Sequence, residues 1–233
     1  MQYKAVFFDR DQTLTCLNQH TKRWVKQQME AWSGKKYQMD YDRMMYLYEL
    51  AEYPEAGLIS VEEEIEFWHR YYSCLLREEG ITEKVSQKVE ILFDHVWMQE
   101  RVLFPEVIYV LETLKKEGLK LGVISDTSPS LSLTLESLGI AKYFDCFICS
   151  DLAGAMKPDP KIYQTALDAL QVSARESIYV DDYDIDADGA RDLGFTAFHI
   201  DRVDSNQEEM QTESLNRWRI TSLKQILDFL HQE

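Results

Sequence analysis

Two aspartates directly after the first apolar run are the strongest chemical feature of the sequence. The run YKAVFF ends at Asp9, and Asp11 follows two positions later, in DRDQT. Two carboxylates this close can divide the work of displacing a group from phosphorus. One attacks as a nucleophile, while the other first protonates the leaving oxygen and later activates water. The pair therefore predicts a site for phosphoryl transfer.

Three later segments hold the other groups that such chemistry needs. Ser125 follows a second apolar run, Lys157 stands in KPDP ahead of a predicted helix, and Asp181 and Asp182 end another apolar run. Mg²⁺ is a hard cation that binds carboxylate and phosphate oxygens together, so it can bridge anions that would otherwise repel. A hydroxyl and an ammonium group can bind the remaining phosphoryl oxygens.

A regular alternation of strands and helices positions these segments. Apolar runs predict strands at residues 3–8, 119–125, 144–149, 177–180 and 196–200. Apolar residues at three- and four-residue spacing predict helices at residues 106–117, 129–138, 160–170 and 185–193. Gly118, Gly139 and Gly194 stand where glycine often ends a helix. The alternation predicts an α/β fold, a Rossmann-like parallel sheet covered on both faces, with ligands beyond the carboxyl ends of its strands.

The alternation is interrupted after the first strand. Residues 17–102 consist of helix-like, polar-rich segments such as DRMMYLYELAEY and SVEEEIEFWHRYY, and Ser60 with Glu63 is typical of a capping box. We predict a helical cap over residues 17–102, inserted into a core of residues 1–16 and 103–233. Six aromatic residues are expected to pack its helices: Trp24, Trp32, Trp68, Tyr71, Tyr72 and Trp97. Near the C-terminus we expect a surface loop at 201–213 and a last helix at 222–231.

Composition limits the partners of the chain. Its 233 residues include 41 acidic and 25 basic side chains, a formal net charge of −16. This acidity argues against nucleic acid or an anionic membrane surface as a partner. The sequence has neither a signal-peptide pattern nor an apolar run long enough to span a membrane, so a cytoplasmic protein is expected.

The four cysteines are too few and too scattered for a disulfide framework. Cys146 and Cys149 form a CxxC, but they lie in the run YFDCFICSD, which is aromatic and β-branched. Such a run is typical of a buried strand and not of a redox turn ahead of a helix. Both thiols are therefore expected to pack as small apolar groups.

In their order along the chain, these segments resemble the haloacid dehalogenase superfamily. Its phosphatases carry DxDxT after an apolar run, then a Ser or Thr after a strand, then a Lys, then an acidic pair. The present chain has all four between about residues 3 and 200, and its insertion resembles the helical cap of subclass I members. The resemblance implies a Mg²⁺-dependent phosphomonoester hydrolase that acts on a small phosphorylated metabolite through an aspartyl-phosphate.

The resemblance also implies a role for each catalytic residue. Asp9 would be the nucleophile, and Asp11 the general acid and base. Ser125 and Lys157 would bind the phosphoryl group.

The metal set implied by the resemblance consists of oxygen ligands. The Asp9 carboxylate, the backbone carbonyl of Asp11 and Asp182 would hold Mg²⁺, with Asp181 in a supporting role. Asp186 would orient either a metal-bound water or Lys157.

Two positions depart from the family pattern, and other functions stay open. Gln12 stands where Gly is common, and Asp126 where Asn is frequent. The alternatives are a sugar-phosphate mutase of the same superfamily and a non-catalytic binding module, whereas Asp11 argues against a dehalogenase. The natural substrate and the oligomeric state stay open.

Overall fold

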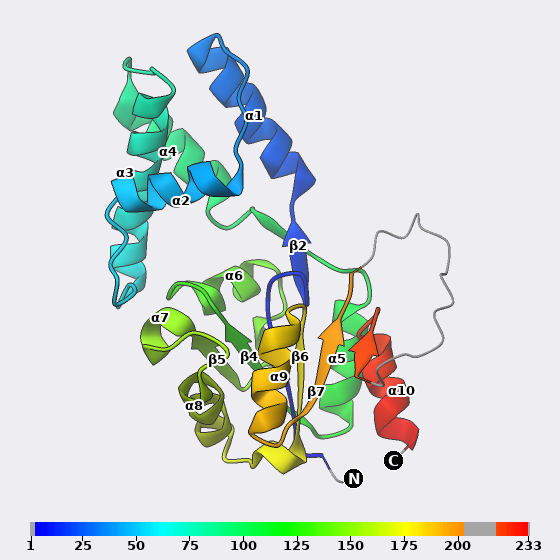
Figure 1. Ribbon diagram of the computed structural model, residues 1–233. Helices are drawn as coiled ribbons and strands as arrows, with labels where there is room; N and C mark the ends of the chain where they lie inside the picture. Colours follow the sequence, from blue (N-terminus) through cyan, green and yellow to red (C-terminus); the bar gives the residue numbers. More distant parts are fainter. Residues whose placement is uncertain (1–2, 203–217, 233) are drawn as a thin grey trace.

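The core of the protein is a six-stranded parallel sheet. The computed structural model describes residues 3–202 and 218–232 (Figure 1). The strand order is β5-β4-β1-β6-β7-β8, and every neighbouring pair is parallel. The strands are β1 Ala5–Phe8, β4 Lys120–Ser125, β5 Cys146–Cys149, β6 Ser177–Asp181, β7 Thr196–Ile200 and β8 Arg219–Ile220. This confirms the predicted α/β fold.

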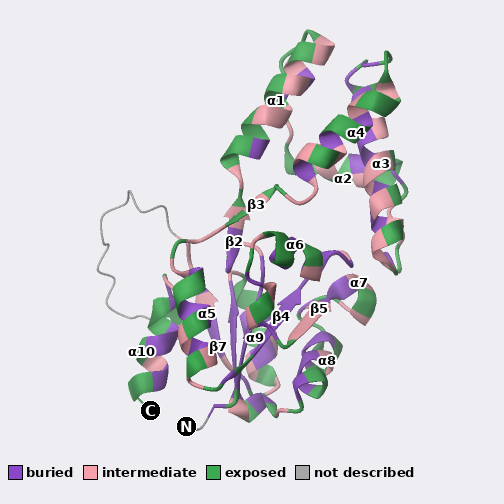
Figure 2. Ribbon diagram, turned by 180° about the vertical axis from the view of Figure 1, so that it is seen from behind, coloured by how far each residue is buried: buried purple, intermediate pink, exposed green. Residues whose placement is uncertain are grey.

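Helices cover both faces of the sheet. The helices that pack on one face are α5 Val107–Lys116, α6 Leu131–Ser137 and α10 Lys224–Gln232, and those on the other are α8 Pro160–Leu170 and α9 Asp184–Asp192. Along β1, Val6 and Phe8 join the first cluster, whereas Ala5 and Phe7 join the second. Because a parallel strand covered on both faces is buried throughout, β1 is apolar at every position. Figure 2 shows the buried strands and the exposed outer faces of the helices.

The predicted core elements are all present, with ends shifted by a few residues. Gly118, Gly139 and Gly194 have φ values of 83°, 74° and 100°, the left-handed backbone that favours glycine after a helix. The strand β8 was not predicted, since two residues carry no periodic signal. The predicted loop at 201–213 lies almost entirely outside the described residues. Shorter helices complete the core: η1 Ala141–Tyr143, α7 Ser150–Ala153 and η2 Ala174–Glu176.

The predicted core role of the CxxC is confirmed. Cys149 is buried against one face of the sheet, and Cys146 packs against the other. Three positions apart on a strand, the two side chains point to opposite faces. Burial raises the pKa of Cys146 to about 12, so this thiol is unreactive.

Four helices above the core share a separate hydrophobic cluster. They are α1 Gln19–Ser33, α2 Tyr41–Leu50, α3 Val61–Glu78 and α4 Val85–Val96, and we call them the cap. Phe67 and Leu76 of α3 are fully buried in the cluster together with Leu92 of α4. Five of the predicted aromatic residues pack in or against it, and Trp97 stacks on Phe93. The domain limits at 17 and 102 stay a prediction.

Side-chain contacts fix the start of α3. Ser60 accepts a hydrogen bond from the Glu63 backbone N–H at 3.2 Å, as a helix cap should. The Glu63 carboxylate, however, accepts from the Ile59 N–H and not from that of Ser60. The predicted capping box is therefore displaced by one residue. None of the helices in the described ranges 3–202 and 218–232 has the length and apolar character required to cross a membrane.

Two strands link the cap to the core. β2 Thr15–Leu17 leaves the core and β3 Arg101–Leu103 returns to it, paired antiparallel so that Leu17 lies opposite Arg101. Away from these strands, Glu64 of the cap accepts hydrogen bonds from the backbone N–H and the hydroxyl of Ser130 in the core, both at 2.7 Å. Tyr53 donates to Asp151 of the core at 2.5 Å. The cap therefore also contacts the core directly, at points outside the linking strands.

Candidate active site

A cavity of about 460 Å³ lies at the carboxyl ends of β1, β4 and β6. Asp9 follows β1, Ser125 ends β4 and Asp181 ends β6. Twelve residues line the cavity: Asp9, Asp11, Gln12, Ser125, Asp126, Lys157, Pro158, Asp181, Asp182, Tyr183, Ile185 and Asp186. The structure thus brings all the predicted site residues to one place, although their chemical roles stay predictions.

Lys157 lies between two aspartates. Its Nζ is 2.8 Å from Asp9 Oδ1 and 2.7 Å from Asp181 Oδ2, and the side chain is 3% exposed. Burial alone lowers the pKa of Lys157, but Asp9 and Asp181 outweigh this and hold the pKa well above its usual value. The backbone N–H of Lys157 donates to Asp126 at 3.0 Å. Lys157 is therefore a fixed cation beside Asp9.

Asp181 has three protein donors. Besides Lys157, it accepts hydrogen bonds from the Tyr179 hydroxyl and, at 2.9 Å, from the Tyr183 backbone N–H. The side chain is fully buried. These contacts make Asp181 a positioning residue for Lys157, and its predicted metal role stays a prediction. Asp186 lies 3.6 Å from the same ammonium, consistent with the predicted orientation of Lys157.

Asp9 keeps one oxygen free of protein donors. Its Oδ1 accepts from Lys157, and within residues 3–202 and 218–232 no group donates to Oδ2. Burial raises the pKa of Asp9 to about 7, against the opposing effect of Lys157. Asp9 therefore combines a free oxygen with incomplete charge compensation, which suits a nucleophile that also binds a cation.

Two arginines hold Asp11. Arg10 binds both Asp11 oxygens, through Nε at 2.8 Å and Nη2 at 3.0 Å, and also donates to Thr127. Nη2 of Arg101, on β3, lies 2.9 Å from Asp11 Oδ2. Burial raises the pKa of Asp11, but the two guanidinium groups outweigh it and lower the pKa below its ordinary value. Asp11 is thus held ionised in this arrangement.

Sequence reasoning missed both arginines. Arg10 stands between the two aspartates, a position that could have drawn attention to it. Arg101 carries no such signal, because only the pairing of β2 with β3 brings it to Asp11.

Gln12 adopts a backbone conformation that favours glycine. Its φ is 52°, in the left-handed region, which costs a residue with a side chain about 1 kcal/mol. This explains why Gly is common at this position in the family. The Gln12 side chain is exposed and lines the cavity, where it takes up space that a glycine would leave open.

Asp182 belongs to the same cavity. Burial and the neighbouring Asp181 raise the pKa of Asp182 to about 7. His199, to which we gave no role from sequence, lies with Nε2 2.9 Å from the Asp182 backbone carbonyl. The backbone N–H of Asp182 donates to its own carboxylate, and no other residue in the described ranges does, so the carboxylate keeps lone pairs for a ligand.

The donor set fits a hard divalent cation. Within the described ranges, no three His, Cys, Asp or Glu side chains are arranged to share a metal ion, because Asp11 faces its arginines and Asp181 faces Lys157. The Asp9 and Asp182 carboxylates and the Asp11 backbone carbonyl remain as oxygen ligands. Six aspartates and one lysine line the cavity, a surplus of negative charge that a cation such as Mg²⁺ would compensate.

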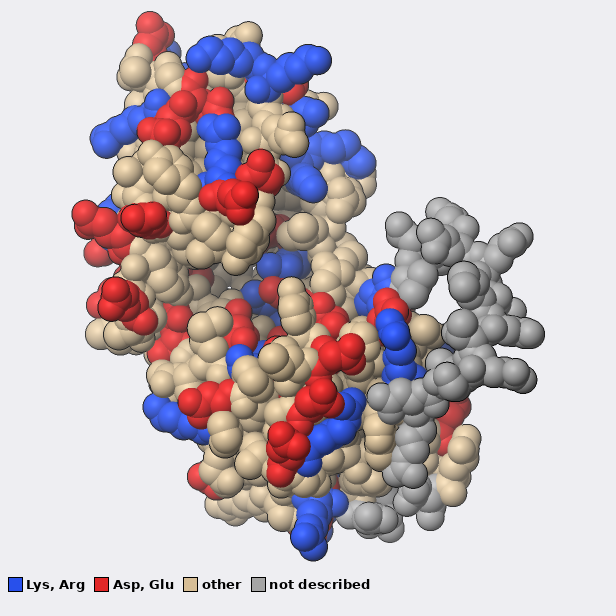
Figure 3. Space-filling model, viewed as in Figure 1, with Lys and Arg blue, Asp and Glu red and all other residues tan. Residues whose placement is uncertain are grey.

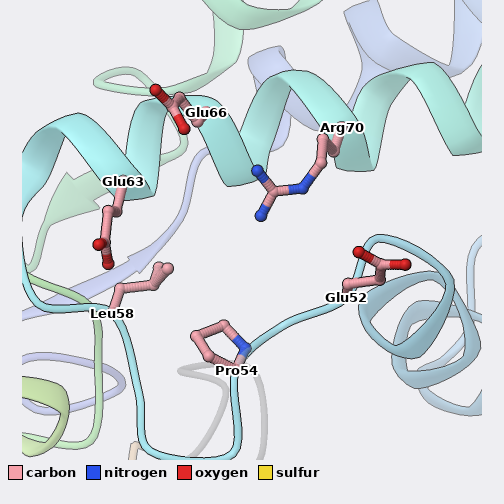
Figure 4. A pocket seen from close by; sticks show the side chains of 6 residues that line it. All are labelled: Glu52, Pro54, Leu58, Glu63, Glu66 and Arg70. Carbon is pink, nitrogen blue, oxygen red and sulfur yellow. The ribbon is translucent and has the colours of Figure 1, made fainter.

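A second, smaller pocket lies within the cap. It has a volume of about 220 Å³, and Figure 4 shows Glu63 and Arg70 pointing from α3 toward the loop that bears Pro54. Arg70 donates to the Ala51 carbonyl at 3.1 Å, and Glu63 accepts from Ile59. These contacts are structural, and the pocket contains no group that the predicted chemistry requires.

The fold places a carboxylate, that of Asp9, at the end of a strand in a parallel sheet covered by helices on both faces. Residues 3–194 match the family model described as haloacid dehalogenase-like hydrolase. The chain belongs to this family of enzymes, as the sequence motifs predicted.

Its relatives have two kinds of activity. The chain is 31% identical over 160 residues to a phosphatase of Mycobacterium tuberculosis, and this match covers 68% of the chain and 70% of the relative. It is 35% identical over 127 residues to an (S)-2-haloacid dehalogenase of Pseudomonas sp. strain YL. That match covers 54% of this chain and only 53% of the dehalogenase, about half the length of each.

Solved structures share the fold over almost the whole chain. The structure of a phosphatase of the same superfamily from Thermococcus onnurineus has a TM-score of 0.64 at 24% identity and covers 99% of both chains. A 2-haloacid dehalogenase from Pseudomonas syringae has a TM-score of 0.66 at 22% identity, also over 99% of both chains. At these identities the likeness shows the fold alone.

Proposed function

We propose that the chain is a Mg²⁺-dependent phosphomonoester hydrolase that acts on a small phosphorylated metabolite through an aspartyl-phosphate on Asp9. The observation that carries this proposal is the contact of Asp9 with the buried ammonium of Lys157 at 2.8 Å, in a cavity that Asp11 also lines. A carboxylate with a free oxygen can attack phosphorus while the adjacent cation binds a phosphoryl oxygen. The phosphatase among the relatives supports this choice of substrate.

In the first step, Asp9 Oδ2 forms a bond to phosphorus and the bond from phosphorus to the ester oxygen breaks. Asp11, which is ionised in the substrate-free protein, takes up a proton from solvent when the substrate is bound and gives it to this leaving oxygen. In the second step, Asp11 takes a proton from water, which attacks the phosphorus and releases phosphate from Asp9. Lys157 and the Ser125 hydroxyl bind phosphoryl oxygens in both steps, since positioning and charge stabilisation provide most of the rate in phosphoryl transfer.

The Asp9 and Asp182 carboxylates and the Asp11 backbone carbonyl would hold Mg²⁺. When bound, the cation supplies positive charge between Asp9 and the phosphate, which otherwise repel. His199 supports this set, because its hydrogen bond fixes the backbone of Asp182.

Dehalogenation is the second candidate, because a relative at 35% identity has that activity. A carboxylate nucleophile and a lysine could serve it too. Displacement of halide from carbon, however, needs neither a proton donor for a leaving oxygen nor a metal-binding carboxylate, and this chain has Asp11 and Asp182 for both. These residues favour the phosphatase.

A product assay tests the proposal. With Mg²⁺ present, the protein should release inorganic phosphate from a panel of phosphorylated sugars, nucleotides and small acids, and no chloride from 2-chloropropionate. Chloride release without phosphate release would establish the dehalogenase. A phosphorylated sugar that is isomerised without loss of phosphate would establish the mutase, and no reaction with any compound would favour a binding module.

Magnesium binding should depend on pH. Burial raises the pKa of Asp9 and of Asp182 to about 7 in the metal-free protein, so below pH 7 protons compete with the cation for both carboxylates. The concentration of Mg²⁺ at half saturation, followed by the thermal shift of the protein, should be about 100-fold higher at pH 6 than at pH 8, about 10-fold for each carboxylate. Addition of EDTA should abolish turnover, and Mg²⁺ should restore it. Equal affinity at the two pH values would contradict the assignment of these ligands.

A further inference from the structure

The cavity is divided into a charged floor and an uncharged mouth. The floor consists of the buried lining residues, all polar or charged: Asp9, Ser125, Lys157, Asp181 and Asp186. The mouth consists of the exposed lining residues, none of them charged: Gln12, Pro158, Tyr183 and Ile185. The other three lining residues are half-buried aspartates. The part of a ligand that extends out of the floor therefore meets uncharged and mostly apolar side chains.

Two large side chains of the mouth are exposed to an unusual extent. Tyr183 is 65% exposed and Ile185 62%, and both line the cavity. They stand at the start of α9, where the Tyr183 backbone N–H donates to Asp181 at 2.9 Å and so fixes the loop beside the floor. Single exposed apolar side chains are common on protein surfaces, but two that line one cavity form a surface that a ligand can cover.

The charges around the mouth do not favour a charged ligand there. Asp184 lies between Tyr183 and Ile185 in the sequence, and its carboxylate is 3.0 Å from the ring of His199. Figure 3 shows acidic side chains along the lower edge of the hollow between the cap and the core and over α9 below it. A negative group at the mouth would be repelled by these carboxylates. A positive group would find no carboxylate among the exposed lining residues.

We propose that Tyr183 and Ile185 bind the alcohol part of the substrate, and that this part is uncharged and has an apolar face. The inference rests on the proposed function, in which Asp9 attacks phosphorus from the floor. Because the attacking and leaving oxygens lie roughly in line, the alcohol part points from the floor toward the mouth. There the ring of Tyr183 and the side chain of Ile185 remove its apolar atoms from water.

A series of alkyl phosphates tests the apolar contact. Ethyl, propyl, butyl and pentyl phosphate differ only in the number of their methylenes, so the reacting groups stay the same. Full burial of a methylene raises affinity about 4-fold and half burial about 2-fold. From ethyl to pentyl phosphate, the kcat/KM of the wild type should therefore rise at least about 8-fold.

Two pairs of esters of equal shape test the absence of charge. The first is 4-methylpentyl phosphate and 4-phosphonooxybutanoate, which ends in a carboxylate. The second is 3,3-dimethylbutyl phosphate and phosphocholine, which carries a quaternary ammonium group. In each pair the wild type should prefer the uncharged ester by about 10-fold or more, because a charge at an apolar surface loses hydration without gaining a partner. Equal or faster turnover of either charged ester would overturn the inference.

Substitutions at the mouth assign the contact to its residues. In the double variant Tyr183→Ala with Ile185→Ala, the rise from ethyl to pentyl phosphate should fall below about 2-fold, whereas Tyr183→Phe keeps the ring and should retain it. The matched control is Ile108→Ala, because Ile108 is also an exposed second residue of a helix, α5, and lies outside the cavity. This variant should leave the rise unchanged.

Two kinds of failure are distinguishable. A wild type whose kcat/KM does not rise along the series, or a double variant that slows all the alkyl esters equally, would overturn the inference alone. So would turnover of the phosphorylated sugars, nucleotides and small acids without turnover of any alkyl ester. If no phosphate is released from any of these compounds, the proposed function is overturned as well.

Discussion

The variant Asp9→Asn should lose phosphate-ester turnover by about 10⁴-fold or more, while its fold stays intact. An amide cannot attack phosphorus, and loss of a nucleophile removes the covalent route as a whole. The variant should not be less stable than the wild type at pH 8. Burial raises the pKa of Asp9 to about 7, so its ionised form costs folding free energy as the pH rises from about 4 to 7, and Asn removes this cost. Initial rates of phosphate release and thermal unfolding measure the two effects.

Trapping of the intermediate makes this experiment specific. Acid-quenched wild type should contain a peptide with Asp9 that is heavier by one phosphoryl group, and Asp9→Asn should contain none. Asp192→Asn, at the exposed end of α9, is the matched control and should retain full activity. If Asp9→Asn keeps activity within about 10-fold of the wild type, another group must be the nucleophile.

The sequence predicted the parts of the site that local pattern determines. An apolar run followed by polar residues predicts a buried strand with a functional end, and this located Asp9, Ser125 and Asp181 at one edge of the sheet. Their proximity follows because parallel strands that neighbour each other end on the same side. Lys157 was predicted from another local pattern, its position in KPDP just ahead of a helix.

Contacts that depend on the path of the cap could not be predicted. Arg101 reaches Asp11 only because β2 and β3 pair, and three-residue strands have no periodicity that a sequence pattern could reveal. The hydrogen bonds of Asp181 were hidden for another reason. The sequence of an acidic pair does not show which member faces a buried lysine. In this pair the Tyr179 hydroxyl donates to Asp181, but nothing in the sequence distinguishes Tyr179 from other strand residues.

The arginines also change how the cap relates to the chemistry. Arg101 lies on the strand that returns from the cap, so movement of the cap would carry its guanidinium relative to Asp11. The acid of the proposed mechanism is thereby coupled to the position of the cap.

Replacement of Lys157 by methionine should have the largest effect on stability. The change leaves Asp9 and Asp181 buried together without a cation, and removal of one partner from a buried ion pair costs about 3–5 kcal/mol. Lys157 stabilises the wild type throughout the range below about pH 10, where it is charged in both states. The loss in Lys157→Met should therefore be larger at pH 8 than at pH 5, because Asp9, whose pKa burial raises to about 7, is protonated at pH 5 and then no longer repels Asp181. Urea unfolding at both pH values measures it.

A second substitution separates this charge effect from loss of packing. Adding Asp181→Asn to Lys157→Met should recover part of the stability at pH 8, since it removes one of the uncompensated carboxylates, but it should not recover turnover. Lys161→Met, on the exposed first turn of α8, is the matched control and should change stability by less than about 0.5 kcal/mol. If Lys157→Met unfolds at the same urea concentration as the wild type at pH 8, Lys157 does not compensate the charge of Asp9 and Asp181. The buried ammonium would then have to be maintained for phosphate binding alone.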